Sequence, residues 1–320
     1  MPEVYDWTTD VEDGGVLKNH KISNKLLEQA ARKFVVAPFS QKVTDFGKHM
    51  GEYVTLVYFK ELDVPTSAAL EEETRVPIDK LEHGTRQIQV VPMGRGVEYS
   101  TLAQDLMKFD PKMAVQKRLI NQMKNVIDNT CATAFKQAKI IFIPTSLTGG
   151  TWDTDGTPST TALVNLTLDH IATIRDYMAN DLHVPFYNGE TYTGLFATKA
   201  LRGLKQDKVL TAWNHYLQKG DVLYRSEAGM AEQVRFVEVT NTGALSNGVG
   251  SGSVLGEGLV FGDEAVSRVE VTAPHLRVDP NYQSNFGLIK AAIWYGIIGY
   301  ATTWDTANDL EAKVVRVGSA

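Results

Sequence analysis

Residues 110–139, DPKMAVQKRLINQMKNVIDNTCATAFKQAK, are the stretch around which the rest of the chain is interpreted. Asp110 is a favoured N-cap residue, and Pro111 is tolerated at the first helical position because the N–H that it lacks would be unpaired there. The pattern therefore predicts one long helix that begins at Pro111. At about 1.5 Å per residue this helix is roughly 40 Å long, well beyond the usual helix of about 11–12 residues.

The two faces of the predicted helix differ in chemistry. Apolar residues recur at spacings of three and four, which predicts a single apolar stripe. The stripe consists of Met113, Leu119, Ile120, Met123, Val126, Ile127, Ala134, Phe135 and Ala138. The other face carries Lys112, Lys117, Arg118, Lys124, Lys136 and Lys139 against a single acid, Asp128. Two interpretations are open: a core-spanning helix with a solvated basic face, or a basic face that contacts a partner.

Composition indicates a folded protein. The chain has 320 residues, of which 43% are apolar and 22% charged, enough for one large domain or two to three subdomains. The net charge of −6 excludes a generally basic nucleic-acid binder, so contact with a polyanion would need a local basic patch. Cys131 is the only cysteine, which excludes an intramolecular disulfide and favours a reducing compartment. No signal peptide or membrane-spanning segment is predicted, so we expect no membrane partner.

The residues ahead of the long helix predict an arm and a ribbon. Residues 1–20 are acidic and predict an extended arm, and a helix is predicted at 24–35. Strands are predicted at 53–60 and 85–92, and about two dozen polar residues with Glu71, Glu72 and Glu73 separate them. A compact domain rarely keeps so long a polar connection, and a lone ribbon is marginal in water. We therefore expect a projecting two-stranded arm that lies on another subunit. A surface loop over the chain's own core is the alternative.

A mixed α+β body is predicted after the long helix. Strands are expected at 139–144, 191–197, 233–240, 265–272 and 309–317, and helices at 168–181 and 198–217. Residues 145–161 are expected to be a loop. Residues 243–262 contain seven glycines and predict an irregular loop. Residues 285–303 are apolar and aromatic.

Motifs of catalysis, cofactor binding and metal binding are absent from the sequence. There is no phosphate-cradling loop and no nucleophile elbow, and no two histidines have the spacing of a helical metal site. Asp153 and Asp155 ahead of Gly156 resemble a calcium loop, but Thr151 and Ala162 occupy its first and twelfth ligand positions. We therefore expect an Asx-type turn there, and no catalytic residue, cofactor or metal in the chain.

The order of these elements resembles that of the major capsid proteins of tailed bacteriophages with the HK97 fold. Three segments carry the resemblance. Residues 85–135 read as a strand, a glycine turn and a spine helix; residues 184–199, VPFYNGETYTGLFATK, read as a strand that enters an A-domain; and residues 296–317 form the C-terminal segment. The likeness is greatest to the major capsid proteins of short-tailed, N4-type phages.

The resemblance implies an α+β capsid fold in four parts. These are an N-terminal arm and short helix at 1–50, an E-loop at 51–100, a P-domain at 101–165 with its spine helix at 111–138, and an A-domain at 166–320, part of which returns to the P-domain. The apolar stripe of the helix would pack on the subunit's own sheet. Glu71, Glu72 and Glu73 at the E-loop tip would either contact a neighbouring basic patch or stay solvated. The loop at 242–257 would lie at the hexamer and pentamer axes, with Gly243, Gly248, Gly250, Gly252 and Gly256.

The function implied by the resemblance is structural. The chain would assemble as pentamers and hexamers into an icosahedral shell around double-stranded DNA, formed in the bacterial cytoplasm and carried in the virion. Portal, scaffold and decoration proteins would be further partners. Two roles are open for Lys112, Lys117, Arg118, Lys124 and Lys136: contact with DNA phosphates, or pairing with acids of a neighbouring subunit. An encapsulin-like compartment around an enzyme, or a soluble α+β enzyme or binding protein, are the alternatives.

Overall fold

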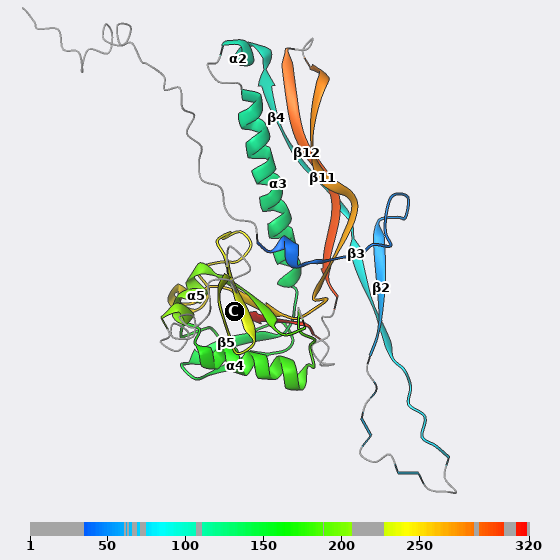
Figure 1. Ribbon diagram of the computed structural model, residues 1–320, viewed down its shortest axis with the longest axis vertical. Helices are drawn as coiled ribbons and strands as arrows, with labels where there is room; N and C mark the ends of the chain where they lie inside the picture. Colours follow the sequence, from blue (N-terminus) through cyan, green and yellow to red (C-terminus); the bar gives the residue numbers. More distant parts are fainter. Residues whose placement is uncertain are drawn as a thin grey trace, which may run out of the picture.

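A computed structural model describes most of the chain. The described residues are 35–60, 62, 64–65, 69–70, 75–106, 111–187, 189–206, 227–284, 288–303 and 312–318. The predicted arm at 1–20, nearly all of the helix at 24–35, Glu71, Glu72 and Glu73, and the second half of the helix at 198–217 lie outside them. The described part has a tall spine, a body beside the foot of the spine, and a ribbon that projects from the spine on the other side (Figure 1).

The predicted long helix forms as α3 (Pro111–Phe135). It ends three residues before the predicted limit at 138, because the chain tightens into a turn in which Ala138 N–H donates to Phe135 O. Its apolar stripe is divided between two cores. Leu119 and the partly buried Met123 pack against Trp294, whereas Phe135 lies in a separate buried cluster. Met113 is 72% exposed, so its predicted packing on the sheet is wrong.

A four-stranded sheet runs alongside α3 in the spine. Its order is β1 (Gln41–Lys42), β11 (Val266–Ser284), β12 (Ile289–Thr302) and β4 (Val91–Ser100). The apolar residues at 285–303 thus supply most of a long strand, and β11 extends well past the predicted limit at 272. A short helix, α2 (Thr101–Leu106), follows β4 at the far end of the spine.

The predicted glycine turn ahead of the spine helix is wrong. Gly94 and Gly96 lie inside β4, where they pair with Tyr295 and Ile293 of β12. A Cβ at Gly94 would lie 2.7 Å from the carbonyl oxygen of Trp294. These glycines therefore mark a close approach between two strands, which a sequence pattern does not separate from a turn.

The body is built on a seven-stranded sheet in the order β6-β5-β13-β10-β7-β9-β8. The strands are β5 (Ile141–Ser146), β6 (Gly149–Asp153), β7 (Tyr192–Ala197), β8 (Glu227–Ala231), β9 (Val234–Val239), β10 (Gly258–Phe261) and β13 (Val314–Val317). The expected loop at 145–161 is partly wrong, because β6 forms a hairpin with β5 there. The chain enters this body after α3, returns to the spine as β11 and β12, and ends in the body as β13.

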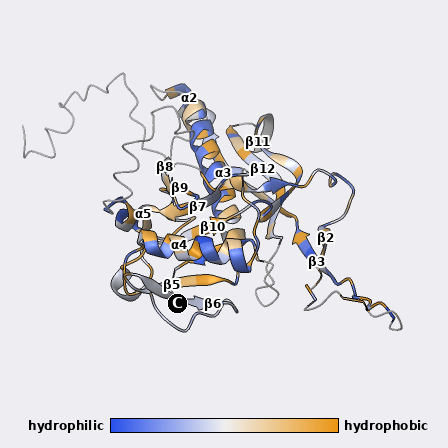
Figure 2. Cartoon of the chain, turned by 60° about the horizontal axis from the view of Figure 1, so that its bottom comes forward, coloured by the Kyte–Doolittle hydropathy of each residue, from blue (hydrophilic) through white to orange (hydrophobic). Residues whose placement is uncertain are grey.

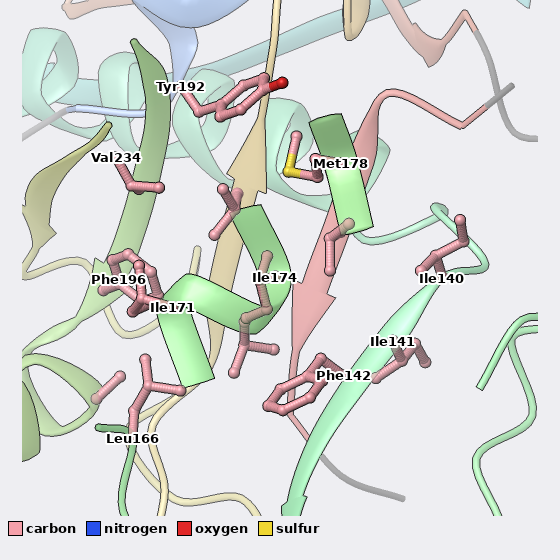
Figure 3. Close-up of a cluster of buried hydrophobic side chains, with 14 of the residues drawn as sticks. Ile140, Ile141, Phe142, Leu166, Ile171, Ile174, Met178, Tyr192, Phe196 and Val234 are labelled. Atoms are coloured by element: carbon pink, nitrogen blue, oxygen red, sulfur yellow. The ribbon is translucent and has the colours of Figure 1, made fainter. Parts of the chain in front are cut away.

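Helices cover the seven-stranded sheet. They are α4 (Leu168–Asp176) with a π-helical turn, η2 (Tyr177–Asp181), and α5 (Thr198–Lys205). Ile171, Ile174 and Met178 point from α4 and η2 toward strand residues such as Phe142 and Phe196 (Figure 3). The predicted helix at 168–181 is confirmed, and its apolar spacing of three and four residues is what buries this face.

The projecting ribbon joins the spine at Gly299 of β12. The ribbon consists of β2 (Tyr53–Phe59) and β3 (His83–Gln89), and β3 continues through Val90 into β4. A Cβ at Gly299 would clash with the carbonyl oxygen of Gln89 and lie 3.1 Å from Ile88 Cγ2. Only a residue without a side chain allows the root of the ribbon to lie this close to β12.

Replacing Gly299 by alanine should therefore destabilise the subunit. The added methyl group meets backbone, which must move, and overpacking of this kind costs about 1–3 kcal/mol of unfolding free energy. Chemical denaturation of the unassembled chain measures it. The matched control is Gly318→Ala, because a Cβ at Gly318 meets nothing within 4 Å. Equal stability of the two variants would show that the close approach at Gly299 is not a constraint.

Candidate interaction surfaces

One face of the ribbon packs on a small core at its root, and the other face, called the bare face below, exposes Tyr53, Val57 and Phe59. The predicted strands pair antiparallel, with Tyr53 opposite Gln89 and Phe59 opposite His83, which confirms the two-stranded arm. Val54 and Leu56 turn toward a small core around Ile88 and Val90 at the root. The alternate residues Tyr53, Val57 and Phe59 are 52%, 58% and 62% exposed. Strand alternation thus places an apolar row on the outer face of an element that projects from the molecule.

Apolar side chains are also exposed in the segment between the two ribbon strands. Val64 is 93% exposed and Ile78 75%, and Leu62, Leu70, Val76 and Leu81 are exposed as well. Hydrophobic and hydrophilic residues are interspersed along the ribbon (Figure 2). A row of exposed apolar side chains on one face of a projecting element is typical of a surface that binds another protein. Because Glu71, Glu72 and Glu73 lie outside the described residues, their contact with a neighbour stays a prediction.

Four of the predicted basic residues lie exposed along α3. They are Lys112, Lys117, Arg118 and Lys124. The fifth residue is Lys136, whose Nζ lies 2.5 Å from Glu257 Oε2 of the same chain. The Glu257 carboxylate also accepts a hydrogen bond of 2.7 Å from Ser246 N–H. The structure therefore ties Lys136 to the body, beyond the end of the helix that carries the other four.

Asp128 does not lie on the solvated basic face, and that prediction is wrong. Its side chain is fully buried, because the segment at 36–39 and the loop after β9 cover this part of α3. Its Oδ1 accepts hydrogen bonds from Val36 N–H at 2.7 Å and Ala37 N–H at 3.0 Å. The two N–H groups belong to the start of the short 3₁₀ helix η1 (Ala37–Phe39), where a carboxylate is a favourable partner.

Cys131 lies one turn further along α3 and is also fully buried. Burial, with a smaller contribution from the Asp128 carboxylate, raises the pKa of its thiol to about 12. The thiol is therefore protonated at neutral pH and unreactive, as expected for a small residue packed in a core.

The glycine-rich segment after β9 packs against the molecule. Leu245 and Leu255 are fully buried, and a Cβ at Gly243 would lie 2.8 Å from Asn129 Nδ2 of α3. Gly250 and Gly252 have φ values of +85° and +63°, around the short 3₁₀ helix η3 (Ser251–Ser253). Gly248 and Gly256 complete the predicted set, and the proximity of this segment to a symmetry axis stays a prediction.

The residues that could hold a metal do not gather in the described part of the chain. No three His, Cys, Asp or Glu residues there form a cluster. At the calcium-like sequence, Gly156 N–H donates to Asp153 Oδ1 at 2.9 Å and Thr157 N–H to Asp155 Oδ1 at 2.8 Å, which confirms the Asx-type turn. The buried His170 ring hydrogen bonds Ser146 O at 2.8 Å, and burial lowers its pKa. No helix in the described ranges is long and apolar enough to cross a membrane.

Solved structures share this arrangement from end to end. The alignment with a chain of the cyanophage Pam1 capsid covers 98% of this chain and 99% of the capsid chain, with a TM-score of 0.66 and 15% identity. The alignment with a chain of the capsid of Ralstonia phage GP4 covers 98% of this chain and 98% of the capsid chain, with a TM-score of 0.64 and 15% identity. The alignment with a chain of the capsid of cyanophage P-SCSP1u covers 96% of this chain and 94% of the capsid chain, with a TM-score of 0.63 and 11% identity.

The chain has the HK97-like fold of phage capsid proteins. No protein-family model and no curated protein sequence matches it. The capsid fold is thus carried by the order and packing of elements, since few residues are identical between these chains. The exposed apolar face of the ribbon could have been found in the sequence, because Tyr53, Val57 and Phe59 occupy alternate positions of a predicted strand that precedes a long polar connection. The buried role of Asp128 has no such local signal.

Proposed function

We propose that this chain is the major capsid protein of a tailed phage, which assembles as pentamers and hexamers into an icosahedral shell around double-stranded DNA. The observation that carries the proposal is the bare apolar face of the projecting ribbon in a chain with a capsid fold over its whole length. A two-stranded ribbon is marginal in water by itself, so its outer face is stabilised when a neighbour covers it. The role is structural and non-enzymatic.

Closure of the shell follows from repetition of one contact. A head-to-tail interface between identical chains closes into a ring when the rotation per subunit fits five-fold or six-fold symmetry. Each contact can be weak, because many act together in one shell. The ribbon and the segment between its strands act as the E-loop, the part around α3 as the P-domain, and the seven-stranded body as the A-domain. Glu71, Glu72 and Glu73 contact a basic patch on the adjacent subunit, and residues 242–257 face the ring axis.

The exposed basic residues of α3 give the shell a surface for its contents. Lys112, Lys117, Arg118 and Lys124 would contact phosphates without reading base sequence. Lys136, which pairs with Glu257, lies beyond the end of α3. Assembly takes place in the bacterial cytoplasm, and portal, scaffold and decoration proteins complete the virion.

Imaging of the purified chain tests the proposal. We expect size-exclusion chromatography and negative-stain electron microscopy to find capsomers and closed shells, alone or with the other head proteins of the phage. DNA inside native particles identifies a phage capsid, whereas a co-purifying enzyme identifies an encapsulin-like compartment. Monomers or small oligomers under every assembly condition would contradict both kinds of shell.

A further inference from the structure

The loop between β9 and β10 is linked to α3 and to the residue that directly follows α3, at two places seven to eight residues apart. At its start, Asn241 Nδ2 donates hydrogen bonds to Asn129 Oδ1 at 2.8 Å and to Asp128 Oδ2 at 3.3 Å. At its end, Glu257 forms the ion pair with Lys136. The loop belongs to the seven-stranded body and α3 belongs to the spine, so both links join one body of the subunit to the other.

Close packing holds the loop between these two links. Gly243 contacts Asn129 where no side chain fits, and Leu245 lies in the same buried cluster as Cys131 and Phe135 of α3. Asn241 Oδ1 accepts a hydrogen bond of 3.2 Å from Gly243 N–H, which fixes the side-chain amide. A rotation of the body against α3 would break these contacts together.

One carboxylate joins three segments at the first link. Asp128 Oδ2 faces Asn241 of the body, while Asp128 Oδ1 accepts the two N–H groups of Val36 and Ala37. The side chain is fully buried, so solvent cannot take the place of any of these partners. The segment that leads into the ribbon, the spine helix and the body are thereby held in one fixed arrangement.

We propose that this junction sets the curvature of the shell, with Asp128 and Lys136 as positioning residues that hold the seven-stranded body at one angle to α3. The inference rests on the proposed function. In a closed ring every subunit repeats the same geometry, so a small change of angle within the subunit accumulates around the ring and alters closure. A shell with one diameter requires this angle to be reproduced from subunit to subunit within each kind of ring.

The Asp128→Asn variant tests the first link, because it replaces Oδ2, which faces Asn241, by an NH₂ group and leaves Oδ1 in place. Oδ1 still accepts the N–H groups of Val36 and Ala37, but an NH₂ group now faces the NH₂ group of Asn241. We expect loss of the single shell diameter in electron micrographs. The double variant Asp128→Asn with Asn241→Asp restores a donor–acceptor pair between positions 128 and 241 in the reverse sense, and a turn of the Asn129 amide by 180° lets its NH₂ group donate to the new carboxylate. This double variant should restore the diameter. If Asp128 merely stabilised the fold, its replacement would lower the melting temperature of the subunit without changing the diameter of the shells that form.

A second variant tests the other link and keeps the inference falsifiable if the Asp128 variants do not fold. Lys136→Met removes the ion pair to Glu257 and should also broaden the distribution of diameters. Its matched control is Lys205→Met, because Lys205 pairs with Glu238 at 3.0 Å entirely within the body. That variant should give shells of the original diameter.

The outcomes separate the inference from the proposed function. If the unaltered chain forms no shell under any assembly condition, the proposed function is wrong and the inference with it. If the unaltered chain forms shells, and Asp128→Asn and Lys136→Met shells keep one narrow diameter, the inference is overturned and the proposed function stands. Broadened diameters in both variants, with recovery in the double variant, support the inference.

Discussion

Replacing Val57 and Phe59 together by aspartate should abolish shell formation and leave the subunit folded. Both side chains are more than half exposed on the bare face of the ribbon, so the change removes little packing within the chain. Surface substitutions of this kind usually alter the free energy of unfolding by no more than about 0.5 kcal/mol. In an assembled ring the same positions would bury two unpaired carboxylates against a neighbour, which is strongly unfavourable.

Light scattering and electron microscopy measure the loss of shells, and thermal denaturation of the unassembled chain measures the fold. The matched control is Val57→Thr with Phe59→Tyr, which keeps the shape of each side chain and its preference for a strand. The control should still form shells. Normal shells from the aspartate variant would contradict the view that a neighbour covers this face of the ribbon.

Reversing the charge of Lys117, Arg118 and Lys124 should leave shells intact and lower their DNA content. All three side chains are exposed along one helix, α3. For every phosphate that the helix no longer neutralises, the salt dependence of DNA binding by unassembled capsomers should become shallower by about 0.9 in logarithmic slope. Nuclease-protected DNA per particle measures the effect in assembled shells.

A control with the same total change in charge separates a local contact from a general repulsion of DNA. Replacing Lys199, Arg202 and Lys205 of α5 by glutamate alters a helix of the body and leaves α3 unchanged. This variant should retain its DNA. If the α3 variant fails to form shells, its charges pair with acids of a neighbouring subunit. If the α3 variant forms shells with normal DNA content, the basic residues of α3 contact neither DNA nor acidic residues of a neighbouring subunit.

Local sequence patterns determined the elements of this protein. Pro111 at a helix start and the apolar spacing behind it predicted α3, whose start is confirmed. The β-branched and aromatic residues of YVTLVYFK and the alternation in TRQIQVVP predicted the ribbon, whose pairing is confirmed. These features depend on backbone preferences and on periodicity within one segment, and a sequence displays both directly. The order of the elements was enough to indicate the capsid fold.

The same patterns misassigned residues whose partners lie far away in the chain. Gly94 and Gly96 looked like a turn, but they lie inside β4 because β12, some 200 residues later, passes close beside them. Residues 149–153 looked like loop, but they complete a hairpin with β5. In each case the decisive contact depends on a partner strand that the residue types of the segment do not reveal.

Asp128, Lys136 and the bare face of the ribbon give the clearest division between sequence and tertiary structure. By itself the sequence determined that α3 carries charge on one side and that the ribbon strands alternate. Only the tertiary structure decided that Asp128 is buried beneath Val36 and Asn241, that Lys136 pairs with Glu257, and that Val57 and Phe59 lack cover. The physical reason is that residue type and spacing fix local conformation, whereas burial and charge pairing depend on which distant surface packs over a residue.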